Sequence, residues 1–250
     1  MLQVTSDYGF YSQSHGYTVS MACNPYEVQE AQRLRYKVFA EEMGARLNPS
    51  IFELDQDRFD PWCKHLIVRD RKLGRVVGTY RMLSGFDSRK ISGFYSDQEF
   101  DLSRLDYLRD QIVEVGRACV HQDYRNGVVI SLLWGGLIQY AIRNHFNYLM
   151  GCASISLADG GAGAANIYAS LEKKAMCPID YRVFPRSPLS LDGFQLQDNY
   201  PIPALIKGYV RLGSYVCGEP TWDPDFNTAD ILMLLSLNQL SPRYAKKLFR

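Results

Sequence analysis

The stretch IVEVGRACVHQDYRNGVVISLLWGGL, residues 112–137, constrains the fold more than any other part of the sequence. It opens with a run of mostly apolar and β-branched residues, which favours a buried strand, yet this run includes Glu114 and Arg117. A short polar segment follows, and a long apolar helix is predicted at about residues 125–146. Because backbone N–H groups at a helix start attract anions, the order strand, loop and helix predicts a phosphate-binding corner.

A helix is predicted ahead of this stretch, with clear signals at both ends. Asn24 can cap it, Pro25 suits the first helical position, Glu27 gives a start like a capping box, and Gly44 ends it. The other predicted helices lie at residues 163–175, 202–214 and 241–250, with one short helix in the loop-rich stretch 84–110. The predicted strands lie at residues 64–70, 75–83, 148–156, 181–185 and 229–237.

No repeat or low-complexity linker divides the chain. An early helix, a hairpin and then strand–helix–strand are typical of one α/β or α+β domain with a mixed sheet. We therefore expect a single domain at residues 21–250 and a tail or edge segment at residues 1–20.

Composition narrows the class of protein. Lys and Arg number 28 against 27 Asp and Glu, so the charge balance does not suit a general nucleic-acid binder. The six cysteines show no CxxC pair and no zinc-site spacing, which fits a reducing compartment. The start of the chain has no signal-peptide pattern, and the uncharged stretch 126–142 is short for a membrane span. We expect a cytoplasmic location, with peripheral association at the inner membrane left open.

Three arginines lie in segments that otherwise face inward: Arg35 in the first helix, Arg81 in the second strand of the hairpin, and Arg117. A buried guanidinium needs a partner, because an unpaired one costs several kcal/mol. A purely structural role is one interpretation, with Arg117 pairing with Glu114 or an aspartate to hold the sheet. Three such residues together favour a polar site.

Possible partners lie in an acidic loop. Its carboxylates are Glu53, Asp55, Asp57 and Asp60. The loop can be a solvated acidic segment or a pocket for a cationic ligand such as an amine. Calcium is a weaker alternative, because the loop lacks the glycine and the twelfth-position glutamate of an EF-hand.

Glu114 and Arg117 are three residues apart, so on a regular strand their side chains would face opposite sides. Gly116 lies between them and permits a β-bulge, which would re-aim one of the two. The loop that follows, Gln122 to Gly127, resembles the acyl-donor corner of GNAT-type N-acyltransferases, although Arg125 stands where that family has its first glycine.

A second resemblance is to the acyl-homoserine-lactone synthases. They share Arg…Phe on the first helix, a spaced acidic triplet, an arginine after a GT-like strand, and E-x-x-R. The matching positions here are Arg35 with Phe39, Asp55, Asp57 and Asp60, Arg81 in GTYR, and Glu114 with Arg117.

The chain is most similar to the ornithine N-alpha-acyltransferases and their hemolysin-like relatives. The matching segments include LRYKVFAEEMG, EVGRACVHQDYR and, near the end, LIKGYVRLGSYVCGEPTWDPDFNTADILMLL, and the resemblance covers roughly residues 25–250. It implies a GNAT-like acyltransferase fold, with a central mixed, mostly antiparallel sheet flanked by helices and a C-terminal extension. It also implies transfer of a 3-hydroxyacyl chain from acyl carrier protein to the α-amine of ornithine.

The resemblance suggests roles for particular residues. Glu114 is the expected proton acceptor, with His121 as the alternative. Asp55, Asp57 and Asp60 are expected to hold cationic groups of the acceptor, and Arg35, Arg81 or Arg117 its carboxylate. N–H groups around Val120 and His121 are expected to polarise the thioester. Arg125, Asn126 and Gly127, at the helix start, are expected to meet the pantetheine phosphate. A covalent intermediate on Cys119 or Cys152 is a further alternative.

The expected donor is the acyl-phosphopantetheine of acyl carrier protein, with no permanently bound cofactor and no metal. A basic surface suits that acidic partner, and residues 241–250 supply four basic residues, although a solvated basic helix explains them equally well. A separate O-acyltransferase would complete an ornithine lipid. The open alternatives are another acceptor, such as glycine, lysine or tyrosine, and a non-catalytic lipid- or membrane-binding protein.

Overall fold

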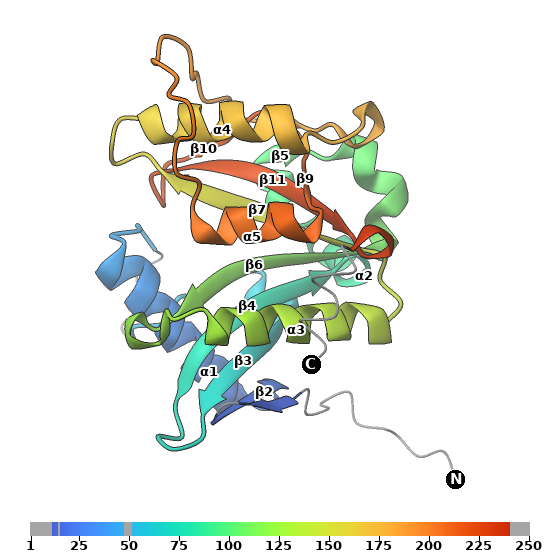
Figure 1. Cartoon of the computed structure of the whole chain (residues 1–250). Coiled ribbons are helices and arrows are strands. Elements are labelled where there is room, and N and C mark those ends of the chain that lie inside the picture. Colours follow the sequence, from blue (N-terminus) through green and yellow to red (C-terminus); the bar gives the residue numbers. More distant parts are fainter. Residues whose placement is uncertain (1–11, 15, 48–51, 241–250) are drawn as a thin grey trace. The chain divides into compact units, whose positions relative to one another are not determined.

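The computed structural model divides the chain into two compact units. The first combines residues 1–82 with residues 116–143, and the second combines residues 83–115 with residues 144–250. Figure 1 follows the chain through them by colour. The residues described are 12–14, 16–47 and 52–240.

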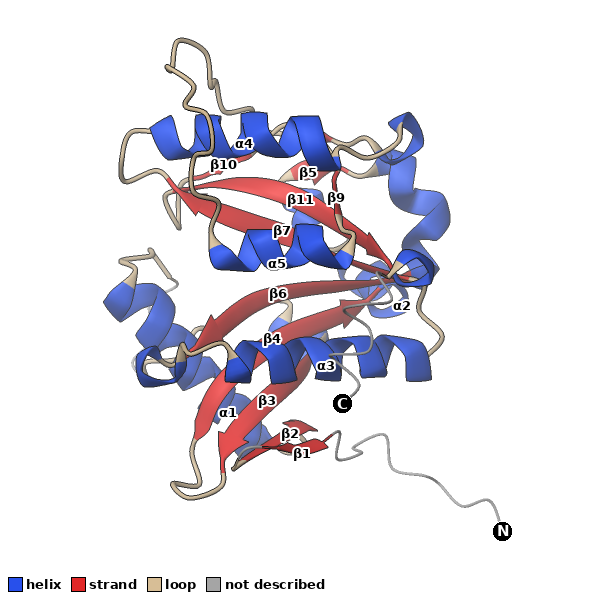
Figure 2. Cartoon of the chain, viewed as in Figure 1, coloured by secondary structure: helices blue, strands red, loops and turns tan. Residues whose placement is uncertain are grey.

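The first unit contains a sheet with the strand order β1-β2-β3-β4-β6 (Figure 2). Its strands are β1 (Ser12–Ser14), β2 (Tyr17–Met21), β3 (Lys64–Asp70), β4 (Val76–Ser84) and β6 (Ile112–Val120). Its helices are α1 (Pro25–Tyr36), the π-helix η1 (Lys37–Glu42), the 3-10 helices η2 (Asp60–Trp62) and η6 (Gln122–Tyr124), and α3 (Val128–Arg143). Strands β1 to β4 pair antiparallel in sequence order, which confirms the predicted hairpin.

Helix α1 starts as its sequence predicts. The Oδ1 atom of Asn24 accepts a hydrogen bond from the N–H of Glu27 at 3.0 Å, and the Glu27 carboxylate accepts one from the N–H of Cys23 at 2.8 Å. The first interaction satisfies a donor that a helix start leaves free, and the second ties the residue before the cap to the first turn. The helix continues as the π-helix η1, and Gly44 follows with a left-handed φ of +74°.

Helix α3 packs close to the sheet of the first unit, which explains the apolar run in its sequence. A Cβ atom at Gly136 would lie 2.9 Å from Leu66 Cδ2, so a larger residue there would force the Leu66 side chain to shift. Val129, Leu133 and Leu137 are buried in the same helix. The predicted buried helix is confirmed, and it occupies the middle of its predicted range.

The second unit contains strands in the order β6-β7-β11-β10, with β9 also beside β11, and a separate pair β5–β8. Its further strands are β5 (Phe100–Asp101), β7 (Tyr148–Ser156), β8 (Phe184–Pro185), β9 (Tyr215–Val216), β10 (Thr221–Asp223) and β11 (Thr228–Ser236). Its helices are α2 (Gly85–Ser88), α4 (Ala162–Ala175) and α5 (Ala204–Leu212). Its 3-10 helices are η3 (Arg89–Ile91), η4 (Tyr95–Gln98), η5 (Ser103–Gln111), η7 (Ile179–Tyr181) and η8 (Leu237–Gln239).

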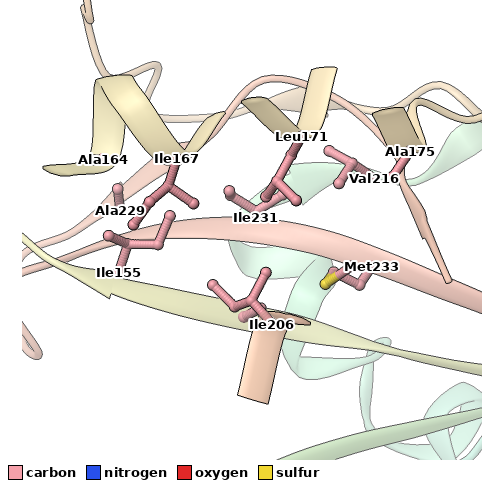
Figure 3. Close-up of a cluster of buried hydrophobic side chains, with 11 residues drawn as sticks. Ile155, Ala164, Ile167, Leu171, Ala175, Ile206, Val216, Ala229, Ile231 and Met233 are labelled. Carbon is pink, nitrogen blue, oxygen red and sulfur yellow. The ribbon is translucent and has the colours of Figure 1, made fainter. Parts of the chain in front are cut away.

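The parallel pairing of β6 with β7 and the antiparallel pairing of β7 with β11 make the sheet mixed, as predicted. One face of β7 and β11 forms a hydrophobic core (Figure 3). Ile155 on β7 and Ile231 on β11 meet Ile167 and Leu171 from α4, and Ile206 from α5. Side chains alternate along a strand, so the neighbours of these residues point to the opposite face.

That opposite face carries Cys152 from β7 and Asp230 from β11. In the register of the two strands Cys152 pairs with Leu232, so Asp230 lies at the diagonal position. The sequence did not predict the short strands β1, β2, β5, β9 and β10. The predicted closing helix at residues 241–250 lies outside the described residues. No helix in the described part of the chain is both long and apolar enough to cross a membrane.

Candidate active site

Helix α1 places Arg35 at the centre of a buried ion-pair network in the first unit. Its side chain is fully buried. Its Nε lies 2.7 Å from Asp55 Oδ2, and its Nη1 lies 2.9 Å from Asp60 Oδ1. A further hydrogen bond of 2.6 Å runs from Nη2 to the backbone oxygen of Asp55. The guanidinium therefore ties the acidic loop to the helix.

The other two arginines join the same network. Arg81 on β4 has Nη1 at 2.7 Å from Asp57 Oδ1 and at 3.0 Å from Asp60 Oδ2. Arg117 on β6 has Nε at 3.3 Å from Asp55 Oδ2 and Nη2 at 3.4 Å from Asp57 Oδ2. The six residues that the sequence singled out thus meet in one place. We call Arg35, Arg81, Arg117, Asp55, Asp57 and Asp60 the arginine–aspartate network.

Charges in this network balance one another. Burial alone would raise the pKa of Asp60, but Arg35 and Arg81 outweigh it and lower that pKa well below its usual range. Burial together with the charge of Arg35 lowers the pKa of His65 to about 4, so its imidazole is neutral at pH 7. Each aspartate of the network is already paired with an arginine. The sequence predicted that these carboxylates would bind a cationic ligand, but here they bind the protein's own guanidiniums.

Strand β6 changes its backbone conformation between Glu114 and Arg117. It pairs with β7 over Ile112–Glu114. Arg117 then has a left-handed φ of +49°, which is uncommon for a residue with a side chain. The sequence predicted an irregularity at Gly116, and the structure has it one residue later. This conformation is what re-aims the Arg117 side chain toward the acidic loop.

The Glu114 side chain is buried in the second unit and accepts several hydrogen bonds. Its Oε2 accepts from the N–H of Tyr95 at 2.7 Å. Its Oε1 accepts from the N–H of Ser96 at 2.8 Å and from the Ser96 hydroxyl at 2.6 Å. The start of the 3-10 helix η4 therefore holds this carboxylate as an anion receptor would.

The hydrogen bonds continue from Ser96 to a second carboxylate. The Ser96 hydroxyl lies 3.5 Å from the Cys152 sulfur, and the Cys152 thiol donates to Glu99 Oε2 at 3.2 Å. The ligand atoms of Glu99, Cys152 and Asp230 all lie within 4.8 Å of one another. We call Glu114, Ser96, Cys152, Glu99 and Asp230 the carboxylate chain. Glu99, Ser96 and Asp230 were missed by the sequence analysis, because no motif or spacing joins them.

The electrostatics of this chain differ from those of the network. Burial and the neighbouring charge of Asp230 raise the pKa of Glu99 to about 8. Burial and the charge of Glu99 raise the pKa of Cys152 well above its usual value. Cys152 is thus a protonated hydrogen-bond donor to Glu99. Burial also raises the pKa of Cys119, so neither thiol is an activated nucleophile.

The loop after β6 places the predicted donor-binding residues at the start of α3. Asn126 Oδ1 accepts from the N–H of Val128 at 3.1 Å, and Gly127 has a left-handed φ of +89°. Arg125 is half exposed, donates from Nε to the backbone oxygen of Val120 at 3.0 Å, and pairs with Glu42. These contacts fix the guanidinium beside the helix start.

His121 precedes this loop and is buried. Burial and the charges of Lys37 and Arg75 lower the pKa of its imidazole, so the ring is neutral at pH 7. Its backbone N–H donates to Val77 at 2.9 Å. Of the two N–H groups expected to polarise the thioester, that of His121 is therefore already engaged, and the hypothesis rests on Val120.

Comparison with known proteins identifies the family. The chain is 34% identical over 242 residues to the L-ornithine N(alpha)-acyltransferase of Brucella abortus, covering 90% of this chain and 86% of that protein. It is 34% identical over 244 residues to the enzyme of the same name from Rhodobacter capsulatus, covering 91% and 93%. The chain belongs to this family. It is accordingly an acyltransferase, as its sequence predicted.

The fold of the family is also evident. The model of the acetyltransferase (GNAT) domain matches residues 34–135. The structure of FeeM, an N-acyl amino acid synthase from uncultured soil microbes, superposes with a TM-score of 0.56 at 14% identity, over 90% of this chain and 93% of that one. The acyl-homoserine-lactone synthase LasI superposes with a TM-score of 0.52 at 15% identity, over 90% and 92%. The expected GNAT-like fold is confirmed.

Proposed function

We propose that this acyltransferase moves a 3-hydroxyacyl chain from acyl carrier protein to the α-amine of ornithine, giving lyso-ornithine lipid. The observation that carries the proposal is the similarity to two enzymes named L-ornithine N(alpha)-acyltransferase over nearly the whole length of both chains. A product of this kind has one acyl chain, so a separate O-acyltransferase would be needed to add a second. Peripheral contact with the inner membrane would suit release of such a product.

The reaction requires a neutral amine next to an activated thioester. The amine nitrogen attacks the carbonyl carbon, negative charge develops on the oxygen, and the C–S bond breaks to release the pantetheine thiol. Hydrogen-bond donors aimed at that oxygen lower the barrier, and holding both reactants in place contributes as much or more. The N–H of Val120 on β6 is our candidate donor to the oxygen.

Glu114 is our candidate for attracting the acceptor's ammonium group. Its carboxylate is buried and held by hydrogen bonds from η4, so its position is fixed. Arg117 is the candidate partner for the acceptor's carboxylate, since its contacts with Asp55 and Asp57 are longer than those of Arg35 and Arg81. Arg35, Arg81 and the three aspartates then position Arg117, a role that differs from the direct contact with the acceptor expected from the sequence.

The donor side rests on the loop before α3. A carrier protein presents one phosphodiester, whereas coenzyme A presents a pyrophosphate and a nucleotide. One guanidinium, Arg125, beside the start of a 16-residue helix suits a single phosphate. We propose that Arg125, Asn126 and Gly127 receive the pantetheine phosphate, and that no cofactor stays bound between turnovers.

Expression of the chain in a bacterium that lacks aminolipids, followed by mass spectrometry of the lipid extract, tests this proposal. An ion matching a 3-hydroxyacyl-ornithine is the expected result. An Arg117→Ala variant should lose the ion, and an Arg46→Ala variant, changed at an arginine outside the network, should keep it. An acylated glycine, lysine or tyrosine in place of ornithine would correct the acceptor. No new lipid from abundant folded protein would contradict the proposal.

A further inference from the structure

The carboxylate chain contains two glutamates whose surroundings differ. Both oxygens of Glu114 accept hydrogen bonds, including two from backbone N–H groups of η4. Such donors favour the ionised carboxylate, because they bind its negative charge more strongly than a neutral carboxyl group. Glu99 is half-buried, and it accepts hydrogen bonds from the side chains of Cys152, whose thiol is a weak donor, and Tyr95. The two environments therefore favour different protonation states.

The groups around Glu99 are mostly acidic. The Cys152 thiol on β7 and the Tyr95 side chain on η4 donate toward it, and the carboxylates of Asp230 on β11 and Asp223 on β10 face it. Arg186 donates its backbone N–H to the Glu99 carbonyl, while its Nε donates to the carbonyl of Asp97. Among the residues that the structure describes, the Glu99 carboxylate takes part in no ion pair.

The position of Glu99 links it to the candidate site. Ser96 contacts both Glu114 and Cys152, and Cys152 contacts Glu99, so the two glutamates lie on the same face of β6, β7 and β11. The Ser96 hydroxyl and the Cys152 thiol therefore connect an ammonium group held at Glu114 to the Glu99 carboxylate. Where two carboxylates have such different environments, the one with the raised pKa is the better proton acceptor near neutral pH.

We propose that Glu99 is the general base of the transfer. This inference rests on the proposed function. The ammonium of the acceptor gives one proton to the Glu99 carboxylate, which leaves a neutral amine and a carboxylic acid. The amine then bonds to the thioester carbon, the second proton on nitrogen moves to the departing sulfur as the C–S bond breaks, and Glu99 returns its proton to water. Glu114 stays ionised throughout.

A base of this kind gives a recognisable pH dependence. In the enzyme without substrate the pKa of Glu99 is about 8, so kcat/KM should rise with pH and level off near pH 8. Glu99→Gln should lower kcat by about 10²–10⁴-fold, with KM for ornithine little changed. The remaining rate of Glu99→Gln should keep rising above pH 8, because that rate depends only on the fraction of ornithine whose α-amine is unprotonated. Glu99→Asp should recover part of the rate.

The experiment measures kcat and KM from pH 6 to 10 for the purified chain, with 3-hydroxyacyl-acyl carrier protein and ornithine. Asp101→Asn, which removes an exposed carboxylate from the same segment, is the matched control. A Glu99→Gln variant with wild-type kcat overturns the inference and leaves the proposed function standing. A Glu99→Gln variant that keeps wild-type kcat but has a raised KM for ornithine, with its rate on glycine unchanged, also overturns the inference. That result would mean that Glu99 binds ornithine and does not accept its proton. A wild-type chain that acylates no amino acid overturns both.

Discussion

The arginine–aspartate network and the carboxylate chain are both buried clusters of charged residues, but they differ in balance. The network has three guanidiniums against three carboxylates, and its shortest ion-pair distances are 2.7 Å. The carboxylate chain combines the carboxylates of Glu99, Asp230 and Glu114 with one thiol and one hydroxyl. Among the described residues, Glu99 takes part in no ion pair. The arginine–aspartate network holds the acidic loop to α1 and β4. The carboxylate chain contains a group, Glu99, whose pKa lies near neutral pH.

This difference suggests a division of work within the protein. Buried charges that neutralise one another are expensive to separate, so they serve as scaffold. Buried carboxylates that crowd one another shift their protonation equilibria, and such shifts gather at functional sites. The predictions below test whether the two clusters behave in these two ways.

Removing the centre of the network should have the largest effect. Arg35→Ala leaves Asp55 and Asp60 buried without their partner, which typically costs about 3–5 kcal/mol. Urea denaturation at pH 7 measures the loss. Arg33→Ala, two residues away on the exposed side of α1, should change the free energy of unfolding by about 0.5 kcal/mol or less. Equal losses in both variants would mean that the network does not stabilise the fold.

Removing the proton site of the chain should instead stabilise the protein at alkaline pH. Folded Glu99 holds its proton up to about pH 8, whereas the ordinary value is 4.5, so the folded state binds more protons between these values. Stability therefore falls as the pH rises through this range. Glu99→Gln lacks this dependence, and its advantage over wild type should grow between pH 5 and pH 9 by about 4 kcal/mol, since each pKa unit corresponds to about 1.4 kcal/mol.

Thermal denaturation of both proteins across that range measures the difference. A constant offset between Glu99→Gln and wild type would show that Glu99 ionises normally in the folded protein. The arginine–aspartate network predicts the opposite direction. The lowered pKa of Asp60 supports stability above its usual value of 3.8, and that contribution is lost as the pH falls below it.

Arg125 lies outside both clusters and should affect activity more than stability. Its ion pair with Glu42 is half exposed, and such pairs contribute about 0–1 kcal/mol. Arg125→Ala should raise KM for the carrier-protein donor by roughly tenfold, since one charge-assisted hydrogen bond is lost. Glu42→Gln keeps the guanidinium and should leave that KM near wild type. Steady-state kinetics with varied donor decides the point, and an unchanged KM for Arg125→Ala would remove it from the donor site.

Cys152 should show the smallest effect on activity. Its pKa is raised well above the usual value, so the thiol is protonated and serves as a hydrogen-bond donor. Cys152→Ser keeps a donor in the same place, and kcat should stay within about tenfold of wild type. Mass spectrometry of the protein during turnover should find no acyl group on Cys152. A trapped acyl-enzyme would restore the covalent alternative.

The sequence was sufficient for the network but insufficient for the chain. Arg35, Arg81 and Arg117 were visible because a guanidinium is conspicuous in an apolar segment, and the acidic loop supplied matching charge. Sequence alone did not decide whether the aspartates bind a cationic ligand or pair within the protein. Their spacing does not show that each one already has an arginine partner. Glu99 and Asp230 are 131 positions apart, and only the pairing of β7 with β11 and the fold of η4 bring them together.

Prediction of the fold followed the same pattern. Long elements with clear periodicity, such as α3, β4 and β11, were found close to their observed bounds. The two-residue strands β5 and β9 carry too few residues for any period, and their pairing partners define them. The left-handed backbone at Arg117 was expected at the neighbouring glycine, because local preference favours Gly116 while the ion pairs favour re-aiming the arginine.

A direct titration of Glu99 tests the distinction between the two clusters. With ¹³C-labelled glutamate, carboxyl resonances of the wild-type protein can be followed by NMR from pH 4 to 10 and assigned with Glu99→Gln. We predict that the resonance missing from the variant titrates with a pKa of about 8. A Glu99 resonance that titrates below about 5, like an ordinary glutamate, would contradict the account.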